Sequence, residues 1–344
     1  MYYFLCCVQL CFTLGTYTHE QGGKINELFR YFSHSCDGYV IYGSATYFTA
    51  LGGVFSERSG VVNIALEGLM LFGAFIGIVT TLLMGDTRGS MTPWIALLFA
   101  AIGSGLFALL HAVASITFRA DQVVSGVAIN FLALGLTVFA IKKIFGKGQT
   151  DFIQYRIEKI DVPGLSDIPV IGKIFFSNAP LTSYIAIILA FVVWYVIYKT
   201  PFGLRLRAVG EHPMAADTMG INVYKMRYIA VAISGMFAGV GGAVFAMSIS
   251  GNFSGATITG QGFLALAAMI FGKWNPLGAL GAALFFGFAQ SLGITGGTIP
   301  VLKEIPSVFL TILPYVFTIL ALVGFVGRSE APKALGTPYE KGKR

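Results

Sequence analysis

The sequence is short of charge: Asp, Glu, Lys and Arg together make up only 11% of its 344 residues. A soluble domain usually has about a quarter of its residues charged. Apolar residues make up 56% of this chain, and its mean hydropathy is +0.76. The composition therefore excludes an ordinary soluble protein and indicates one that crosses a membrane several times.

Histidine and cysteine are scarce as well, with four of each. The histidines are too scattered for a metal site, and Cys6, Cys7 and Cys11 have neither a histidine neighbour nor the spacing of metal ligands. The sequence also lacks the phosphate-binding loop of ATPases, the H-E-x-x-H pattern of zinc proteases and the G-x-S-x-G setting of a hydrolase serine. We expect no catalytic residue, no metal and no bound cofactor.

The net charge of +7 comes without basic residues interleaved with aromatic ones on a soluble face. Nucleic-acid binding explains this charge poorly, whereas basic cytoplasmic loops explain it well. We therefore place the polar loop 199–228 and the basic tail 328–344 in the cytoplasm. The connection 146–181 then faces outward, and its prolines at 163, 169 and 180 predict an irregular rather than a helical chain.

Long apolar runs, with small residues that let helices approach closely, predict an all-α, polytopic fold. Residues 1–38 contain an apolar run at 2–18, which we interpret as a divergent first span, followed by a polar segment. With that run the fold has nine to ten spans, and the transmembrane domain covers 39–327. The remaining predicted spans are 39–55, 61–83, 93–117, 123–145, 182–199, 229–248, 258–271, 276–293 and 306–326.

The 199–228 loop contains a short helix signal. Pro213 follows Glu211 and His212 at an expected first helical position, and Gly220 comes just past the expected last turn. A helix of two turns is unstable alone in water, so it must lean on this protein or on another one. A structured loop without further function is the simpler interpretation of the same residues.

Polar residues within the apolar runs are the other candidates. Asn63 and Glu67 lie four apart, which on a helix puts them on one face, and an intramembrane carboxylate usually faces a partner or a polar cavity. Glu57 and Arg58 suggest a local ion pair, Asn130 a bond between helices, and Gly235 with Gly239 a packing face. The stretch 250–262, rich in Gly, Ser and Thr, suggests a broken or re-entrant segment, or else an external loop.

The stretch AVGEHPMAADTMGIN, residues 208–222, resembles the coupling loop of ABC-importer permeases, whose pattern is E-A-A-x-x-x-G. Ala215, Ala216, Asp217 and Gly220 match it, whereas Met214 stands where the family often has an acid. That departure is common among permeases for sugars, branched-chain amino acids and nucleosides. Residues 52–70, 118–137, 262–288 and the tail from 313 resemble the nucleoside branch of this group.

The resemblance implies a permease subunit of an ATP-driven importer for nucleosides, multi-pass in the cytoplasmic membrane and working by alternating access. It implies a second, different permease subunit, ATP-binding subunits that hydrolyse ATP, and an external lipid-anchored binding protein. The residues that it assigns to ATPase coupling are Glu211, His212, Pro213, Ala215, Ala216, Asp217 and Gly220. Candidates for the substrate pathway are Asn63, Glu67, Asn130, Asn252 and Gln261.

Three other interpretations remain open at this point. A permease of the same family for a simple sugar or a branched-chain amino acid differs only in substrate. An ion-coupled secondary transporter would have inverted halves and more ionisable residues within its spans. A membrane scaffold without transport would leave the helix signal in 199–228 unexplained.

Overall fold

The computed structural model describes residues 24–160, 179–295 and 330–341, with single helical positions at 309, 312, 316 and 319. The side chains of 24–38, 86 and 295 are outside that description. The predicted first span at 2–18 lies outside the described residues, as does most of the predicted span 306–326. Most of the described chain is helical, and its only named strands are one pair of two residues each, which agrees with the all-α prediction.

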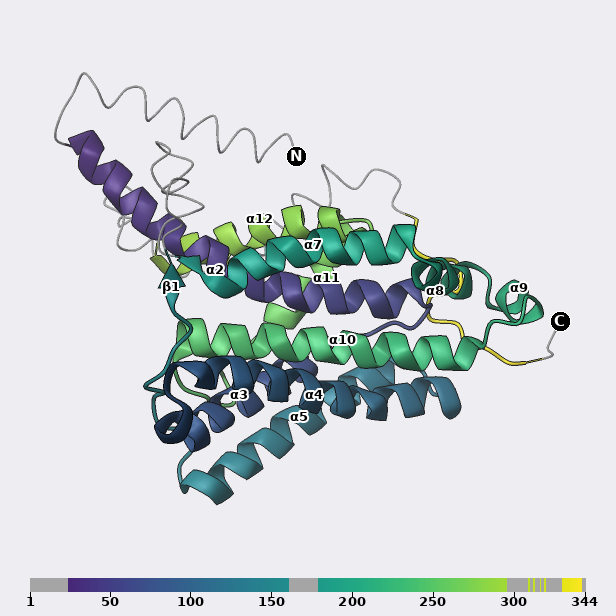
Figure 1. Ribbon diagram of the computed structural model, residues 1–344, viewed down its shortest axis with the longest axis horizontal. Helices are drawn as coiled ribbons and strands as arrows, with labels where there is room; N and C mark the ends of the chain where they lie inside the picture. Colours follow the sequence, from purple (N-terminus) through teal and green to yellow (C-terminus); the bar gives the residue numbers. More distant parts are fainter. Residues whose placement is uncertain are drawn as a thin grey trace.

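One long helix, α10 (Val223–Phe245), lies at the centre of the bundle (Figure 1). On one side it packs against α3 (Leu66–Arg88) and α4 (Thr92–Ala112), with α5 (Gln122–Phe145) beyond them. On the other side it packs against α2 (Lys24–Arg58), which in turn contacts α7 (Leu181–Lys199), α11 (Gln261–Phe271) and α12 (Pro276–Thr295).

Glycines allow α10 to approach its neighbours so closely. A Cβ on Gly235 would lie 2.4 Å from Ala108 Cβ of α4, and one on Gly239 would lie 2.5 Å from the Ala100 carbonyl oxygen. A Cβ on Gly242 would lie 1.8 Å from the Met70 carbonyl oxygen of α3. The predicted packing face at Gly235 and Gly239 is thereby confirmed.

Six helices in the described part of the chain are long and apolar enough to cross a membrane. They correspond to the predicted spans 61–83, 93–117, 123–145, 182–199, 229–248 and 276–293. Two of them end in five-residue π-helical turns, η2 (Val113–Thr117) after α4 and η3 (Ala246–Ser250) after α10. A short 3₁₀ turn, η1 (Gly89–Met91), joins α3 to α4.

Three differences between the predicted boundaries and the structure concern the interpretation of the site. Helix α2 starts at Lys24, so the boundary placed at residue 38 falls inside a helix, and the polar residues 24–38 are the first part of that helix. Helix α3 starts at Leu66, so Asn63 precedes it and does not share a helical face with Glu67. The predicted span 258–271 is an eleven-residue helix, α11. At 1.5 Å per residue α11 is about 16 Å long, roughly half of the hydrocarbon core of a bilayer.

Residues 251–260, before α11, contain no helix. The backbone N–H groups of Thr150 and Ile153 donate to the carbonyl oxygens of Phe253 and Gly251, which ties the start of this stretch to the loop 146–160. In the same loop, β1 (Lys159–Ile160) pairs antiparallel with β2 (Ala179–Pro180) just before α7. The described part of 146–181 is irregular, as predicted, and the stretch 251–260 followed by α11 fits a broken segment.

The polar loop 199–228 forms two short helices at the opposite end of the bundle from β1, beside the C-terminal residues (Figure 1). They are α8 (Pro201–Glu211) and α9 (Pro213–Thr218). Thr200 caps α8 by accepting the Gly203 N–H. The sequence predicted α9 but not α8, whose buried residues, including Leu206 and Val209, recur at helical spacing.

Candidate functional site

Helix α9 begins and ends as its sequence predicts. His212 has a non-helical backbone, with φ −149° and ψ 81°, and Pro213 takes the first helical position. Gly220 has φ +81°, which favours glycine, and its N–H donates to the Asp217 carbonyl oxygen while Ile221 N–H donates to that of Ala216. This geometry fixes α9 as a short, well-delimited helix between α8 and α10.

One side of α9 is anchored and the other is open. The Ala216 side chain is buried against the bundle, whereas Met214 is 38% exposed and Met219 is 82% exposed. Of the remaining predicted coupling residues, Glu211, His212, Ala215 and Gly220 are exposed, and Pro213 and Asp217 are half-buried. Apart from the buried Ala216, the predicted coupling residues therefore lie on an exposed or half-buried surface that also includes the apolar side chains of Met214 and Met219.

The C-terminal residues 330–341, which we call the strap, lie across this end of the bundle. Ala334 N–H donates to the Gly210 carbonyl oxygen, and Lys333 N–H lies 3.4 Å from a carboxylate oxygen of Glu211. The Tyr339 side chain hydrogen-bonds the Asp217 carboxylate of α9. Burial and this carboxylate raise the pKa of the Tyr339 hydroxyl.

The turn 59–65, between α2 and α3, is held by side chains from distant helices. Val62 N–H donates to Gln122 Oε1 at 2.7 Å, and the Val62 carbonyl oxygen lies 3.0 Å from His111 Nε2. Asn130 accepts from Gly68 N–H and donates to the Ile64 carbonyl oxygen. These bonds satisfy backbone groups that a buried turn leaves open, so Asn130 joins two helices as predicted.

The Glu67 carboxylate lies at the N-terminus of the broken helix. Its Oε1 accepts the Gly260 N–H at 2.5 Å, and its Oε2 accepts the Gly262 N–H at 2.6 Å. The first N–H groups of a helix have no partner within the helix, and the helix dipole is positive there. Glu67 therefore caps α11 from α3 and fixes where the broken segment resumes its helix.

The other predicted pathway residues occupy different places. Gln261 is the first residue of α11, beside Glu67, and its Oε1 accepts the Thr259 N–H. Asn63 is fully buried and donates to Ser234 Oγ at 2.8 Å. Asn252 lies between Gly251 and Phe253, whose carbonyl oxygens accept hydrogen bonds from the loop 146–160. Glu67, Asn130 and Gln261 are thus grouped around the starts of α3 and α11, and Asn252 stands at the far end of the broken segment.

The suggested ion pair between Glu57 and Arg58 is wrong. Glu57 Oε2 instead accepts the Trp274 indole N–H at 2.6 Å, and Arg58 donates to the Trp274 carbonyl oxygen and to Tyr198 Oη. Both side chains therefore secure the turn between α11 and α12 to the end of α2. Glu57 and Trp274 are 217 residues apart in the sequence, so only the packing of α2 against α11 and α12 reveals this arrangement.

Sequence reasoning missed α8, the residues that hold the 59–65 turn, and the strap. Among the residues that hold that turn is His111, whose ring nitrogens bond Ser125 Oγ and the Val62 carbonyl oxygen. The sequence did carry a signal for the strap. Its tail contains the large aromatic side chain of Tyr339 among charged residues, which indicates that this part of the tail packs against the protein.

Comparisons with known proteins agree with this arrangement. Residues 35–322 match the family described as branched-chain amino acid transport system / permease component. The chain is 62% identical over 305 residues to the guanosine ABC transporter permease protein NupQ of Bacillus subtilis (strain 168), covering 89% of this chain and 96% of NupQ.

Two further relatives are informative. The nucleoside ABC transporter permease protein NupC of Lactococcus lactis subsp. cremoris (strain MG1363) is 54% identical over 304 residues, covering 88% of this chain and 96% of NupC. The guanosine ABC transporter permease protein NupP, also of Bacillus subtilis, is 28% identical over 302 residues, covering 86% of this chain and 81% of NupP. The chain is a multi-pass membrane protein and belongs to the permease component family of branched-chain amino acid transport systems.

Proposed function

We propose that this chain is the permease subunit of an ATP-driven importer for nucleosides. The observation that carries the proposal is the exposed α9 surface at one end of a membrane bundle, in a chain whose similar relatives are named as guanosine and nucleoside ABC permeases. A short helix that begins at Pro213 and ends before Gly220 suits a rigid element that an ATP-binding subunit can hold.

ATP-binding subunits are the partners of α9 in this proposal. Their closure on ATP moves α9, and the bundle passes between states open to one side and to the other. The whole chain contains no phosphate-binding loop, so ATP hydrolysis belongs to those subunits. The loop 146–160, at the opposite end, then faces outward, toward a lipid-anchored binding protein that delivers the nucleoside.

The second permease subunit is a paralogue rather than a second copy. The support for this is that Bacillus subtilis has two guanosine ABC permease proteins, NupQ and NupP, to which this chain is 62% and 28% identical. We place the substrate pathway where α3, α5 and α11 meet, because Glu67 and Asn130 are half-buried there and Gln261 lies beside Glu67. Asn63 and Asn252 remain candidates for other states of the cycle.

Uptake measurements test this function. The chain is expressed with its partner subunits in a strain without nucleoside uptake, and entry of labelled guanosine and uridine is followed in competition with ribose, glucose and leucine. We expect uptake that excess nucleoside blocks and that the sugars and leucine leave unchanged. A catalytically inactive ATP-binding subunit should abolish uptake, and a protonophore should leave it intact while ATP is maintained.

Other results would point to the alternatives. Uptake blocked by leucine or by a sugar would assign the same machinery to another substrate. Uptake that a protonophore stops at constant ATP would indicate an ion-coupled transporter and would overturn the proposal.

A further inference from the structure

The strap is tied to five separate parts of the bundle. Besides its contacts with α8 and α9, Gly336 N–H donates to the carbonyl oxygen of Gly60, in the turn between α2 and α3. Its Glu340 carboxylate forms an ion pair with Arg119, just before α5, at 3.0 Å. Tyr224 of α10 donates its hydroxyl to the Tyr339 carbonyl oxygen at 3.2 Å, and the two rings meet edge to face.

A buried arginine also belongs to this attachment. Arg227 of α10 is 1% exposed, and its Nη1 donates to the Thr337 carbonyl oxygen at 3.1 Å. Its Nε and Nη2 have no hydrogen-bond partner among the described residues. A cation placed beneath the strap with so few bonds is costly to bury. The strap carbonyl is therefore a needed partner, and the strap is an integral part of this end of the bundle.

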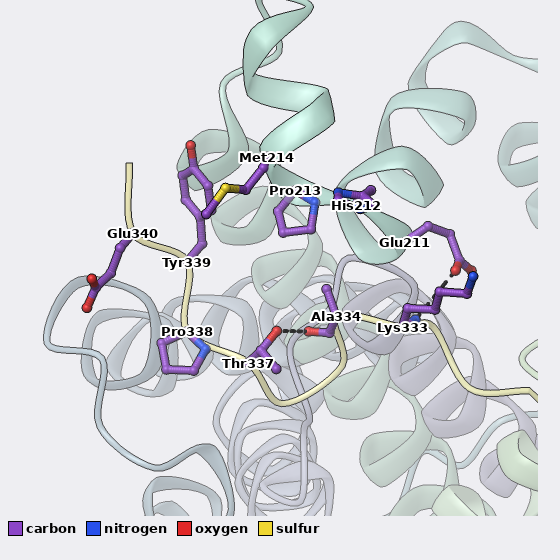
Figure 2. Close-up of a pocket in the computed structure, with 10 residues that line it drawn as sticks. All are labelled: Glu211, His212, Pro213, Met214, Lys333, Ala334, Thr337, Pro338, Tyr339 and Glu340. Carbon is purple, nitrogen blue, oxygen red and sulfur yellow. Dashed lines mark hydrogen bonds between the residues drawn. The ribbon is translucent and has the colours of Figure 1, made fainter. Parts of the chain in front are cut away.

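A hollow of about 350 Å³ separates the strap from α9 (Figure 2). One wall comes from the α8–α9 junction, residues 211–214, and the other from the strap, including Ala334, Pro338 and Tyr339. Apolar side chains line it, among them Pro213, Met214 and Pro338, whereas Glu211, Lys333 and Glu340 bring charge to it. The exposed Met214 of α9 forms part of its lining, so the hollow continues the surface assigned to ATPase coupling.

We propose that the ATP-binding subunit docks on the strap as well as on α9 and inserts an apolar side chain into this hollow. The proposal rests on the function proposed above and names a second contact for the same partner. An apolar centre with a charged rim is the usual composition of a protein–protein interface. A small-molecule site encloses most of its ligand, whereas His212, Lys333, Thr337 and Pro338 leave this hollow exposed at the surface.

The attachments of the strap add a consequence for coupling. A force applied to α9 alone reaches the bundle through α8 and α10. A force applied to the strap also reaches the Gly60 turn through the Gly336 N–H bond. That turn leads into α3, where Glu67 holds the start of α11. Docking on both walls therefore couples the ATP-binding subunit to the broken segment by a short route.

Single cysteines test the docking surface. Cys6, Cys7, Cys11 and Cys36 are first replaced by serine, and one cysteine is introduced at Met214, Lys333, Pro338 or Ala331. Met214 lies on the α9 wall, and Lys333 and Pro338 lie on the strap wall. Ala331 is exposed on the strap but does not line the hollow, so it is the matched control. Labelling by a thiol reagent is compared between the full complex and the permease pair without ATP-binding subunits.

We expect the full complex to lose labelling of Met214→Cys, Lys333→Cys and Pro338→Cys, whereas Ala331→Cys is labelled equally in both preparations. Protection of Met214→Cys with unchanged labelling at Lys333→Cys and Pro338→Cys would overturn the strap contact and leave α9 coupling intact. Unchanged labelling at Met214→Cys as well, in a complex that still transports, would overturn α9 coupling and the strap contact with it.

Discussion

The Oε2 atom of Glu67 lies 2.6 Å from the backbone nitrogen of Gly262, which follows it by 195 residues. The bond joins the first turn of α3 to the first turn of α11, and Oε1 makes a second such bond to Gly260. Two charge-assisted bonds at a helix start are each worth about 1.5–3 kcal/mol. Capping of α11 therefore accounts for a carboxylate, that of Glu67, within an otherwise apolar part of the sequence.

Replacing Glu67 by Gln should destabilise the protein. The amide has one oxygen, so one of the two N–H groups at the start of α11 loses its acceptor and faces an NH₂ group, and the charge that opposes the helix dipole disappears. We expect a lower melting temperature of the purified complex, with uptake falling in parallel. The matched control is Glu158→Gln in the exposed outer loop, which should change neither quantity.

A different result would change the role assigned to Glu67. Lost uptake by Glu67→Gln at parental melting temperature and parental membrane level would show that the charge acts in transport itself. Parental uptake together with parental stability would mean that α11 does not depend on this cap.

Gly220→Val should weaken coupling through the backbone alone. A Cβ at this position meets nothing within 4 Å, so the substitution creates no clash, but φ is +81°. A side chain in the left-handed region costs about 1–2 kcal/mol, and more for a β-branched residue. We expect the end of α9 to shift and uptake to fall relative to ATP hydrolysis.

Gly220→Asn is the control for that experiment, because asparagine tolerates left-handed backbone better than valine does. It should retain most of the uptake. Equal uptake and ATP hydrolysis in the valine variant and the parent would contradict the importance of the α9 C-terminus.

The approach of α10 to α3 gives a packing prediction. Gly242→Ala places a methyl carbon 1.8 Å from the Met70 carbonyl oxygen, so the two helices must separate. Overpacking of this kind typically costs about 1–3 kcal/mol. Gly135→Ala in α5 adds the same methyl group where nothing lies within 4 Å, and because alanine favours a helix more than glycine does, it should not lower stability. The measurement is the melting temperature of both variants and the parent in detergent. A Gly242→Ala melting temperature equal to that of the parent would refute the close packing of α10 against α3.

The sequence predicted best those elements that depend on local composition. The spans at α5, α7 and α12, and the span formed by α4 together with η2, agree with the structure to within two residues at each end, because an apolar run of that length is itself the signal. Pro213 and Gly220 likewise marked α9, since each acts on its own backbone.

Contacts between distant residues could not be predicted in this way. The turn 59–65 is apolar enough to be predicted as part of a span. Folding brings Gln122, His111 and Asn130 to it, and their side chains bond backbone groups of Val62 and Ile64 that have no helical partner. The assignments of Asn63 to a helix and of Glu57 to an ion pair failed for the same reason. The strap depends on Gly60, Arg119 and Arg227, which no sequence pattern links to the tail.

The central claim is that the end of the molecule with α8, α9 and the strap faces the ATP-binding subunits in the cytoplasm. The most direct test labels Met219→Cys, 82% exposed in the parent, and Gln154→Cys in the opposite loop with an impermeant thiol reagent. Both variants lack the native cysteines and are expressed without ATP-binding subunits. The account predicts that intact cells label position 154 at once and position 219 only after permeabilisation. Labelling of position 219 in intact cells, with position 154 shielded, would contradict it.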